Sequence, residues 1–330
     1  MSPKLVSVCI PCFNAERFIA AALDSVLAQT YPHLDIVVVN DGSTDRSREV
    51  LAKYEHRVRL IDQANRGQSA AANAALAASQ GELIKFLDAD DILAPDMIAR
   101  QVARLDNRRD AIVLGEWTRF YNETPGDEVF PRLPMYRDAA PVDWLAAEWM
   151  TARPMMQCAL WLIPREVLND AGLWDERLSL INDFEYFTRV ALASREILFA
   201  PAARLYYRSG VSGSLSGATS RKAVESQFMS LMLGTGHLLA AGSSPHARRA
   251  CANILQAFDY QHYPNHADLR AKIRSRVAEL GGADIAPDGP PGFHKLRPWI
   301  GWKAARHVQH AAERLRLNRA ARLAPARPGV

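Results

Sequence analysis

The sequence of 330 residues contains no apolar run of about 18 residues, the minimum for a membrane span, so we expect no transmembrane helix. Residues 1–14 do not combine a basic start with a long apolar stretch, and we therefore expect no secretory signal. Both absences favour a cytoplasmic protein.

Cysteine is scarce, with only four residues in the chain, which excludes a disulfide scaffold. Cys9 and Cys12 have the C-x-x-C spacing of some redox and metal sites. A redox pair normally sits where a helix begins, whereas these two straddle the end of an apolar run. We interpret them as small buried side chains.

Two glycine-rich phosphate-binding motifs are also absent. No G-x-G-x-x-G follows the first apolar run, which disfavours a dinucleotide-binding dehydrogenase. No G-x-x-x-x-G-K-[ST] occurs either, which excludes a P-loop NTPase.

The composition is that of a globular protein, with 48% apolar and 23% charged residues and a net charge of +4. The basic character lies in residues 295–330, which hold nine basic residues and one acid. The remaining residues hold 31 basic and 35 acidic side chains, a net charge of −4. The basic stretch belongs to no nucleic-acid-binding motif, so we expect no nucleic-acid partner.

Short apolar runs alternate with helical patterns over the first 115 residues. Strands are predicted at 5–10, 36–39, 58–61, 83–87 and 111–114, with helices at 15–29, 46–54, 68–79 and 95–107. This alternation predicts an α/β fold with a mostly parallel central sheet flanked by helices. Ligands of such sheets bind at the carboxyl ends of strands, here residues 11–14, 40–45 and 88–91.

The rest of the chain predicts an appendage to this domain. Residues 158–163 and two short runs at 197–199 and 205–207 are strand candidates. The pattern is helical from 221 to 280, and 281–292 is rich in glycine and proline. We therefore expect a domain at 1–220, a helical extension at 221–280, and a linker with a basic amphipathic tail at 281–330.

Three carboxylates occur within four residues, at Asp88, Asp90 and Asp91, directly after an apolar strand. Such crowding is unfavourable unless a cation or protons offset the charge. Carboxylate-rich sites suit Mg²⁺ or Mn²⁺ that also bind substrate phosphates. If strand geometry continues, Asp88 and Asp90 point to the same side. The alternative is helix capping by Asp91 or Asp96.

Two other strand ends carry nucleotide-binding candidates. Asp41, in Asn40-Asp41-Gly42-Ser43-Thr44-Asp45, follows the second strand, where its carboxylate can accept hydrogen bonds from a base or ribose. Pro11 and Phe13 end the first strand, where backbone groups and the ring can hold a base. Asp-Gly also forms turns that bind no ligand, so the interpretation of Asp41 as a nucleotide-binding residue depends on its position directly after the second strand.

The segment SVCIPCFNAERFIAAALDSVLAQTYPHLDIVVVNDGSTD, followed by FLDADD, resembles the family 2 glycosyltransferases. The resemblance is continuous over residues 5–115 and weaker to about 216. It implies a GT-A fold, a nucleotide-sugar donor, a divalent metal, and single displacement with inversion. It places Pro11, Phe13, Asn14, Asp41, Arg66 and Asp88 at the donor, and Asp88 and Asp90 at the metal. Arg66 has a simple alternative as a solvated side chain.

The resemblance also places the catalytic base at Asp183, in the segment 174–185. Asn182 stands where the family usually has Glu, and the alternative role of Asp183 is to cap the following helix. Asn40 and Ala72 are further departures that affect donor contacts. Arg208 and residues 213–216 resemble a family segment that orders over the donor, without its usual histidine.

These features predict a metal-dependent inverting transferase that uses a nucleotide diphosphate donor, with UDP as the commonest choice. Its acceptor is expected to be a saccharide, lipid-linked or other hydroxyl, in bacterial surface polysaccharide or glycolipid synthesis. The alternatives are a non-catalytic nucleotide-sugar-binding relative and a nucleotidyltransferase, although the latter usually carries a glycine-rich loop near its first strand.

The basic tail allows two interpretations. Val308, Ala312 and Leu315 form a narrow apolar stripe beside several arginines, and Trp299 and Trp302 precede it. This composition suits a helix lying on an anionic membrane surface, which would make the protein peripheral to the inner face of the membrane. The alternative is a helix packed on the protein itself.

Overall fold

The computed structural model describes residues 3–211 and 218–323, with side chains in the second range described as far as Ala312. The strands are β1 Val6–Cys12, β2 Leu34–Asp41, β3 Arg59–Gln63, β4 Leu83–Phe86, β5 Ile92–Leu93, β6 Ala111–Phe120, β7 Trp161–Pro164 and β8 Glu196–Arg208. The helices are α1 Ile19–Leu27, α2 Ser47–Ala52, α3 Gln68–Ala78, α4 Met97–Leu105, α5 Pro141–Trp149, α6 Arg165–Ala171, α7 Asn182–Ala193, α8 Arg221–Ala241, α9 Pro245–His262, α10 Ala267–Glu279 and α11 Pro291–Leu323, with a short 3₁₀ turn, η1, at Cys158–Leu160.

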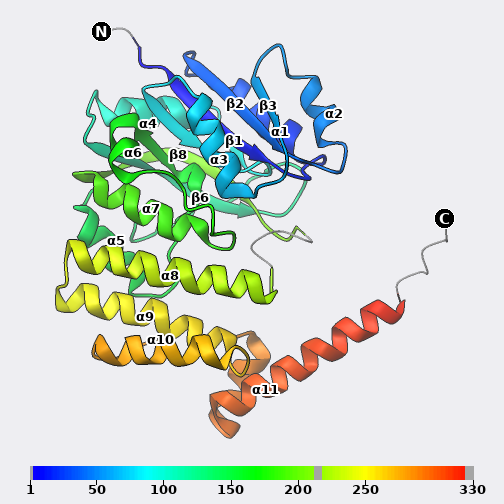
Figure 1. Cartoon of the computed structure of the whole chain (residues 1–330), viewed down its shortest axis with the longest axis vertical. Helices are drawn as coiled ribbons and strands as arrows, with labels where there is room; N and C mark the ends of the chain where they lie inside the picture. The colour runs from blue at the N-terminus through cyan, green and yellow to red at the C-terminus, as the bar shows by residue number, and fades with distance from the viewer. Residues whose placement is uncertain (1–2, 212–217, 324–330) are drawn as a thin grey trace. The chain divides into compact units, whose positions relative to one another are not determined.

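The strands form one sheet in the order β3-β2-β1-β4-β7-β6-β8-β5. The half that contains β3, β2, β1 and β4 is parallel throughout. Strand β7 reverses direction against both β4 and β6, and β8 runs parallel to β6. Figure 1 shows helices α3, α6 and α7 in front of this sheet.

The parallel half follows from its apolar sequence. Six of the seven residues of β1 are buried, as expected for a strand covered on both faces. Helix α3 packs on β1 and β2 through small side chains, with Ala70, Ala71 and Ala75 buried. The close approach brings the start of α3 to the carboxyl ends of these strands, where the predicted site residues lie.

The mixed half differs from the sequence prediction in two respects. Of the strand predicted at 158–163, residues 158–160 form the turn η1, and β7 begins only at Trp161. The two short strands predicted at 197–199 and 205–207 belong to one continuous strand, β8. Its pairing with β6 shifts register between Leu114 and Glu116, which marks an irregularity in the ladder. An interruption of the apolar pattern at 200–204 therefore reflects this irregularity and not a break between strands.

An aromatic cluster fixes α7 to the sheet. The rings of Trp174 and Tyr186 stack with centroids 4.0 Å apart, and Phe86 of β4 meets both edge-on. Helix α8 packs on the other side of α7, where Gly234 faces Phe184. A Cβ atom at position 234 would lie only 2.5 Å from Cε1 of Phe184, so this helix pair requires glycine there.

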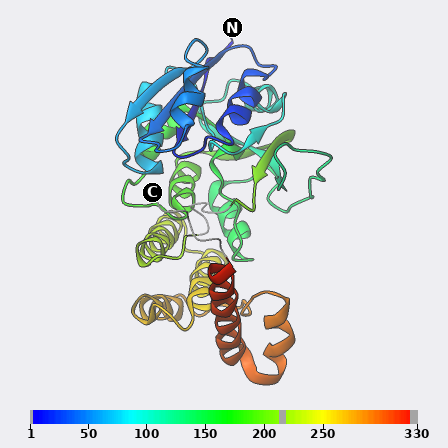
Figure 2. The ribbon, with the colours of Figure 1, turned by 90° about the vertical axis from the view of Figure 1, so that its right-hand side faces the viewer.

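The chain divides into two compact units. The first comprises 1–148 and 153–247 and holds the whole sheet, whereas the second comprises 149–152 and 248–330 and is helical. Within the second unit, α9 and α10 lie side by side (Figures 1 and 2) and are joined by a buried ion pair between Asp259 and Arg270. Trp302 of α11 packs edge-on against Tyr260 and Tyr263.

The structure confirms the predicted fold class: a mostly parallel α/β sheet flanked by helices, followed by a helical C-terminal part. The domain boundaries near residues 220 and 280 stay a prediction. In the described ranges, no helix has the combination of length and apolar character that crossing a bilayer would require.

Candidate functional site

The three acids after β4 lie in a turn and not on an extended strand, because β4 ends at Phe86 and the N–H of Asp91 bonds to the carbonyl of Asp88. The turn brings Asp88 and Asp91 to one amide group. Nε2 of Gln157 lies 3.2 Å from Oδ2 of Asp88 and 2.5 Å from Oδ2 of Asp91. We call Asp88, Asp90 and Asp91 the acid cluster.

The capping alternative for the acid cluster is not seen. Asp91 is completely buried and accepts a hydrogen bond from the backbone N–H of Arg208, 2.8 Å away, on its other oxygen. Asp96 occupies the position before α4, but its side chain makes no capping hydrogen bond. The carboxylates of the cluster are thus available for another role.

Burial and mutual repulsion make ionisation of the acid cluster unfavourable. Burial raises the pKa of Asp88, and burial together with the charge of Asp88 raises the pKa of Asp90 to about 6. Burial and both neighbouring carboxylates raise the pKa of Asp91 well above its usual range. Bound positive charge would relieve this cost.

Asp183 lies in the first turn of α7, close enough to Asp88 to feel its charge. Its Oδ1 is buried and has no hydrogen-bond partner among the described residues. Burial, and then the charge of Asp88, raise the pKa of Asp183 well above its usual range. The side chain does not cap α7; instead Oδ1 of Asn182 accepts a hydrogen bond from the backbone N–H of Asp183, 3.2 Å away.

The first turns of α3 hold the segment that precedes Asp183. Oγ of Ser69 donates to the carbonyl of Leu178 over 3.0 Å and accepts from Nδ2 of Asn182 over 3.1 Å. The side chain of Asn73 bonds to both backbone groups of Trp174. These bonds connect Asp183 to the helix whose first residue, Gln68, donates to Oδ1 of Asp88 over 2.7 Å.

Asp41 organises the loop before α3. Its carboxylate, only 2% exposed, accepts hydrogen bonds from the N–H groups of Arg66 and Gly67 at 2.9 and 2.8 Å, and from Nε2 of Gln63 at 2.7 Å. Gly67 has a φ of 93°, a conformation that glycine adopts without strain. The predicted contact of Asp41 with the donor stays a prediction.

The remaining donor candidates lie around the same strand ends. Pro11 is half-buried at the end of β1, and the ring of Phe13 is 47% exposed. Asn14 has a φ of 49°, and its Oδ1 accepts from the N–H of Thr44 over 2.8 Å. The guanidinium of Arg66 lies 2.9 Å from the carboxylate of Glu176, with both side chains substantially exposed.

Arg208 has a role that the sequence did not indicate. Its guanidinium donates to the backbone carbonyls of Asp90, Asn122 and Glu123, at 2.8, 2.7 and 3.2 Å, and lies against the rings of Phe18 and Phe120. It therefore ties together two loops, the one that holds Asp90 and the one that follows β6, and its contact with a phosphate stays a prediction. The accompanying motif at 213–216 lies outside the described residues.

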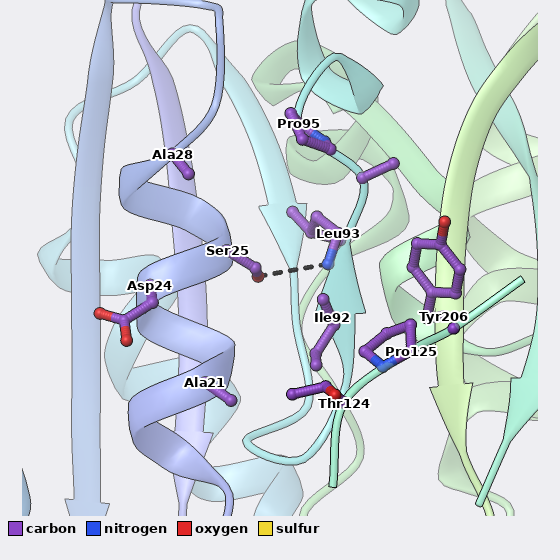
Figure 3. A pocket seen from close by; sticks show the side chains of 12 residues that line it. Ala21, Asp24, Ser25, Ala28, Ile92, Leu93, Pro95, Thr124, Pro125 and Tyr206 are labelled. Carbon is purple, nitrogen blue, oxygen red and sulfur yellow. Dashed lines mark hydrogen bonds between the residues drawn. The ribbon is translucent and has the colours of Figure 1, made fainter. Parts of the chain in front are cut away.

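A pocket of about 420 Å³ lies elsewhere in the first unit, between α1, β5 and the loop around Pro125 (Figure 3). Its lining is mainly apolar, and Oγ of Ser25 accepts a hydrogen bond from the N–H of Leu93 at its floor. None of the predicted site residues lines it. The candidate site is therefore the set of strand ends around Asp88 and Asp183.

Two further observations concern metal and thiol chemistry. Among the described side chains, those of residues 3–211 and 218–312, no group of three or more His, Cys, Asp and Glu is arranged to hold a metal ion. Cys9 and Cys12 are free and buried, and burial raises the pKa of each to about 12. Unreactive thiols agree with the interpretation of this pair as packing residues.

Comparison with protein families gives a match over residues 7–170 to the model of "Glycosyl transferase family 2". An uncharacterized glycosyltransferase of Nostoc sp. is 45% identical over 101 residues, which are 29% of this chain and 31% of the relative. Glycosyltransferase GlyA of Streptococcus pneumoniae is 36% identical over 124 residues, 37% of this chain and 18% of the relative. The chain thus spans about a third or less of the length of these relatives.

Two solved structures share the fold over most of the chain. TarS 1-349 of S. aureus, in complex with UDP-GlcNAc, has a TM-score of 0.66 at 18% identity and covers 84% of this chain and 80% of that one. The mannosyltransferase PcManGT of Pyrobaculum calidifontis, in complex with GDP-Man and Mn²⁺, has a TM-score of 0.54 at 20% identity and covers 92% and 85%. The shared architecture is the GT-A fold.

Proposed function

Since the chain belongs to glycosyl transferase family 2, we propose that it is an inverting transferase that moves a sugar from a nucleotide diphosphate to an acceptor hydroxyl. The observation that carries this proposal is the placement of the buried, unpartnered Oδ1 of Asp183 beside the acid cluster. A base and a site for a charged diphosphate are the two requirements of this reaction.

Donor binding is assigned to the strand ends of the parallel half. Pro11, Asn14 and the exposed ring of Phe13 line the end of β1, where a base can stack and bond to the backbone. Asp41 holds the loop that carries Arg66, and that guanidinium is assigned to the diphosphate. Because TarS binds UDP-GlcNAc with this fold, we propose a uridine nucleotide.

A divalent cation is proposed at the acid cluster, because burial and mutual repulsion raise the pKa values of its three carboxylates and bound positive charge would relieve that cost. The carboxylates as they lie in the described residues do not by themselves form a complete metal site, so the diphosphate is proposed to supply the remaining oxygen ligands. Asp90 and Asp88 would hold Mg²⁺ or Mn²⁺. When bound, the ion would neutralise charge on the leaving diphosphate. The Mn²⁺ in the PcManGT complex agrees with this choice of ion.

Asp183 is assigned the role of general base. The acceptor oxygen forms a bond to the anomeric carbon, the bond from that carbon to the diphosphate breaks, and the acceptor proton passes to Asp183. Attack from the face opposite the diphosphate inverts the configuration. A carboxylate whose pKa is raised takes up this proton more readily once it is ionised.

The acceptor is proposed to be a saccharide, lipid-linked or other hydroxyl in bacterial surface polysaccharide or glycolipid synthesis, in a cytoplasmic setting. Contact with the membrane is proposed for α11, where Trp299 is 87% exposed and Ile300 is also exposed near Lys295 and Lys303. The side chains of 313–330, which complete the predicted amphipathic stripe, lie outside the described residues.

Vesicle co-sedimentation tests the membrane contact. The full chain should partition onto vesicles rich in phosphatidylserine, and less so after replacement of Trp299 and Ile300 by Ser, because interfacial binding needs apolar side chains beside the basic ones. Neutral phosphatidylcholine vesicles are the control. Equal partitioning of both proteins onto both vesicles would contradict the proposal.

The first test of the function is a calorimetric titration of nucleoside diphosphates, with and without Mn²⁺, into the full chain and its Asp90→Ala variant. We expect one nucleotide to bind tightly, and only when both Mn²⁺ and Asp90 are present. Binding of none under either condition would contradict the transferase assignment. Release of pyrophosphate from a nucleoside triphosphate would instead favour a nucleotidyltransferase.

A further inference from the structure

Two glutamine amides hold Asp88, one at each oxygen of its carboxylate. Nε2 of Gln68 donates to Oδ1 over 2.7 Å, and Nε2 of Gln157 donates to Oδ2 over 3.2 Å. The same nitrogen of Gln157 reaches Oδ2 of Asp91 at 2.5 Å. We call Gln68 and Gln157 the glutamine clamp.

The orientation of Gln157 is itself fixed. Its Oε1 accepts a hydrogen bond from the backbone N–H of Ala159 over 2.7 Å, at the start of η1. Because the carbonyl end of the side chain is bound to a donor, the NH₂ end must face the carboxylates. Gln157 is buried, so its two donors have no access to bulk water and serve Asp88 and Asp91.

A neutral donor suits this position better than a cation. Close carboxylates repel one another, and an amide satisfies their lone pairs without removing their charge. An arginine or lysine at position 157 would neutralise the cluster and compete with a bound metal ion. The amide leaves the negative charge of the cluster in place while fixing where two of its three carboxylates lie.

Gln68 connects the clamp to the rest of the site. The residue before it, Gly67, donates its N–H to Asp41, and the residue after it, Ser69, bonds to the segment that carries Asp183. One turn of α3 therefore touches the loop assigned to the donor, the acid cluster and the base segment. Asp88 is the member of the cluster that this turn contacts.

We propose that Gln68 and Gln157 are positioning residues that hold Asp88 and Asp91 where a divalent cation and a nucleoside diphosphate bind together. Asp90, which the clamp does not contact, is left as the carboxylate most open to the ion. This inference rests on the proposed function, because it concerns the same donor site.

The test is calorimetric titration of Mn²⁺ into the full chain in the presence of saturating UDP. Loss of a side chain that orients a metal ligand typically weakens metal binding by about 10–100-fold. We expect a decrease of that size for Gln157→Leu and for Gln68→Leu, with a parallel rise in the donor KM. UDP affinity measured without Mn²⁺ should change less.

Gln101→Leu is the matched control. Gln101 is also a fully buried glutamine with both ends bonded, to Nζ of Lys85 at 2.8 Å and to the carbonyl of Leu160 at 2.8 Å. The Gln101→Leu variant should have a lower thermal stability, because buried hydrogen bonds are lost, but its affinity for Mn²⁺ should be unchanged. A purely structural role of Gln157 would give both variants the same result.

Wild-type affinity for Mn²⁺ in both clamp variants would overturn the inference and leave the proposed function intact. If the circular dichroism of Gln157→Leu shows an unfolded chain, Gln68→Leu decides alone, because Gln68 is partly exposed at a helix start. A wild-type chain that binds neither UDP nor Mn²⁺ contradicts the proposed function itself, and the clamp then has no ligand to position.

Discussion

The acid cluster and Lys85 of the first compact unit differ from Asp259 of the second unit in how their buried charge is handled. In the first, the acid cluster faces amide and backbone donors, and the buried Nζ of Lys85 donates to neutral oxygens of Gln101 and Ala159. In the second, buried Asp259 accepts from two guanidinium groups, those of Arg270 at 2.9 Å and Arg274 at 3.1 Å.

This difference indicates which buried charges serve the chemistry of the protein and which serve its stability. Uncompensated buried charges cost folding free energy and are retained where a ligand or reaction needs them. A paired buried acid serves the fold, because removing one partner leaves the other charge unsatisfied. Substitutions of Asp183 and of the acid cluster should therefore change chemistry more than stability, and substitution of Asp259 the reverse.

The largest expected effect is on turnover. Asp183→Asn keeps the shape of the side chain but removes the base, so the transfer rate should fall by about 10²–10⁴-fold while nucleotide binding persists. Product formation with the donor found by calorimetry measures the rate. Asp170→Asn, at an exposed acid, is the control. Normal turnover by Asp183→Asn would remove Asp183 from the mechanism.

The next effect is on the stability of the second unit. Asp259→Asn leaves the buried guanidinium of Arg270 without its carboxylate, and the free energy of unfolding should fall by about 3–5 kcal/mol. Urea unfolding followed by circular dichroism measures the loss. The double variant Asp259→Leu/Arg270→Met should recover most of it, since no charge is then left buried.

A pH effect is expected from Lys85. Burial lowers the pKa of Lys85 to about 7 from its usual value of 10.5, so between pH 7 and pH 10.5 the unfolded chain binds more protons than the folded one. Stability therefore rises with pH through this window and is lost as pH falls towards 7, by at most about 1.4 kcal/mol per pH unit.

Urea unfolding at pH 7, 8 and 9 checks the Lys85 prediction. Lys85→Met should remove the slope, because the substituted side chain does not titrate. Lys53→Met, at an exposed lysine, should keep the slope of the wild type. Parallel pH profiles for Lys85→Met and the wild type would show that Lys85 stays protonated throughout.

The smallest expected effect is an increase in the stability of the metal-free protein. Asp90→Asn removes one of three close acids, so without metal the free energy of unfolding should rise by about 1 kcal/mol, as at other destabilised functional sites. Thermal unfolding in a chelating buffer measures it. Asp127→Asn, at an exposed loop acid, should change nothing. Lower stability of Asp90→Asn would mean that this carboxylate serves the fold.

The parallel half of the fold was predictable, because continuous apolar runs such as 36–39 alternate with helical patterns. The reversed direction of β7 was not, since no local pattern encodes strand direction. Of the candidate site, Asp88 and Asp90 could be singled out because acids crowded at the end of a strand are conspicuous, whereas Asp183 was indicated by the resemblance to the family 2 glycosyltransferases.

The partners of these acids could not be found in the sequence. Gln157 lies 69 residues after Asp88 and is marked by no motif, so only the folded chain brings the two together. Arg208 was visible as a basic residue, but its three carbonyl partners depend on the shapes of loops around Asp90 and Asn122. Long-range hydrogen bonds of this kind follow from tertiary packing.

The missing side chain at Gly234 has a consequence for the tolerance of this chain to mutation. Any larger residue there displaces Phe184, the neighbour of Asp183, because even a Cβ atom would come within 2.5 Å of the ring. A random library would therefore show a position 51 residues from Asp183 at which substitution also lowers activity, because it moves the ring next to the base. Sequence variation is constrained there because the ring of Phe184 already fills the place of a Cβ atom, and not because position 234 carries a functional group.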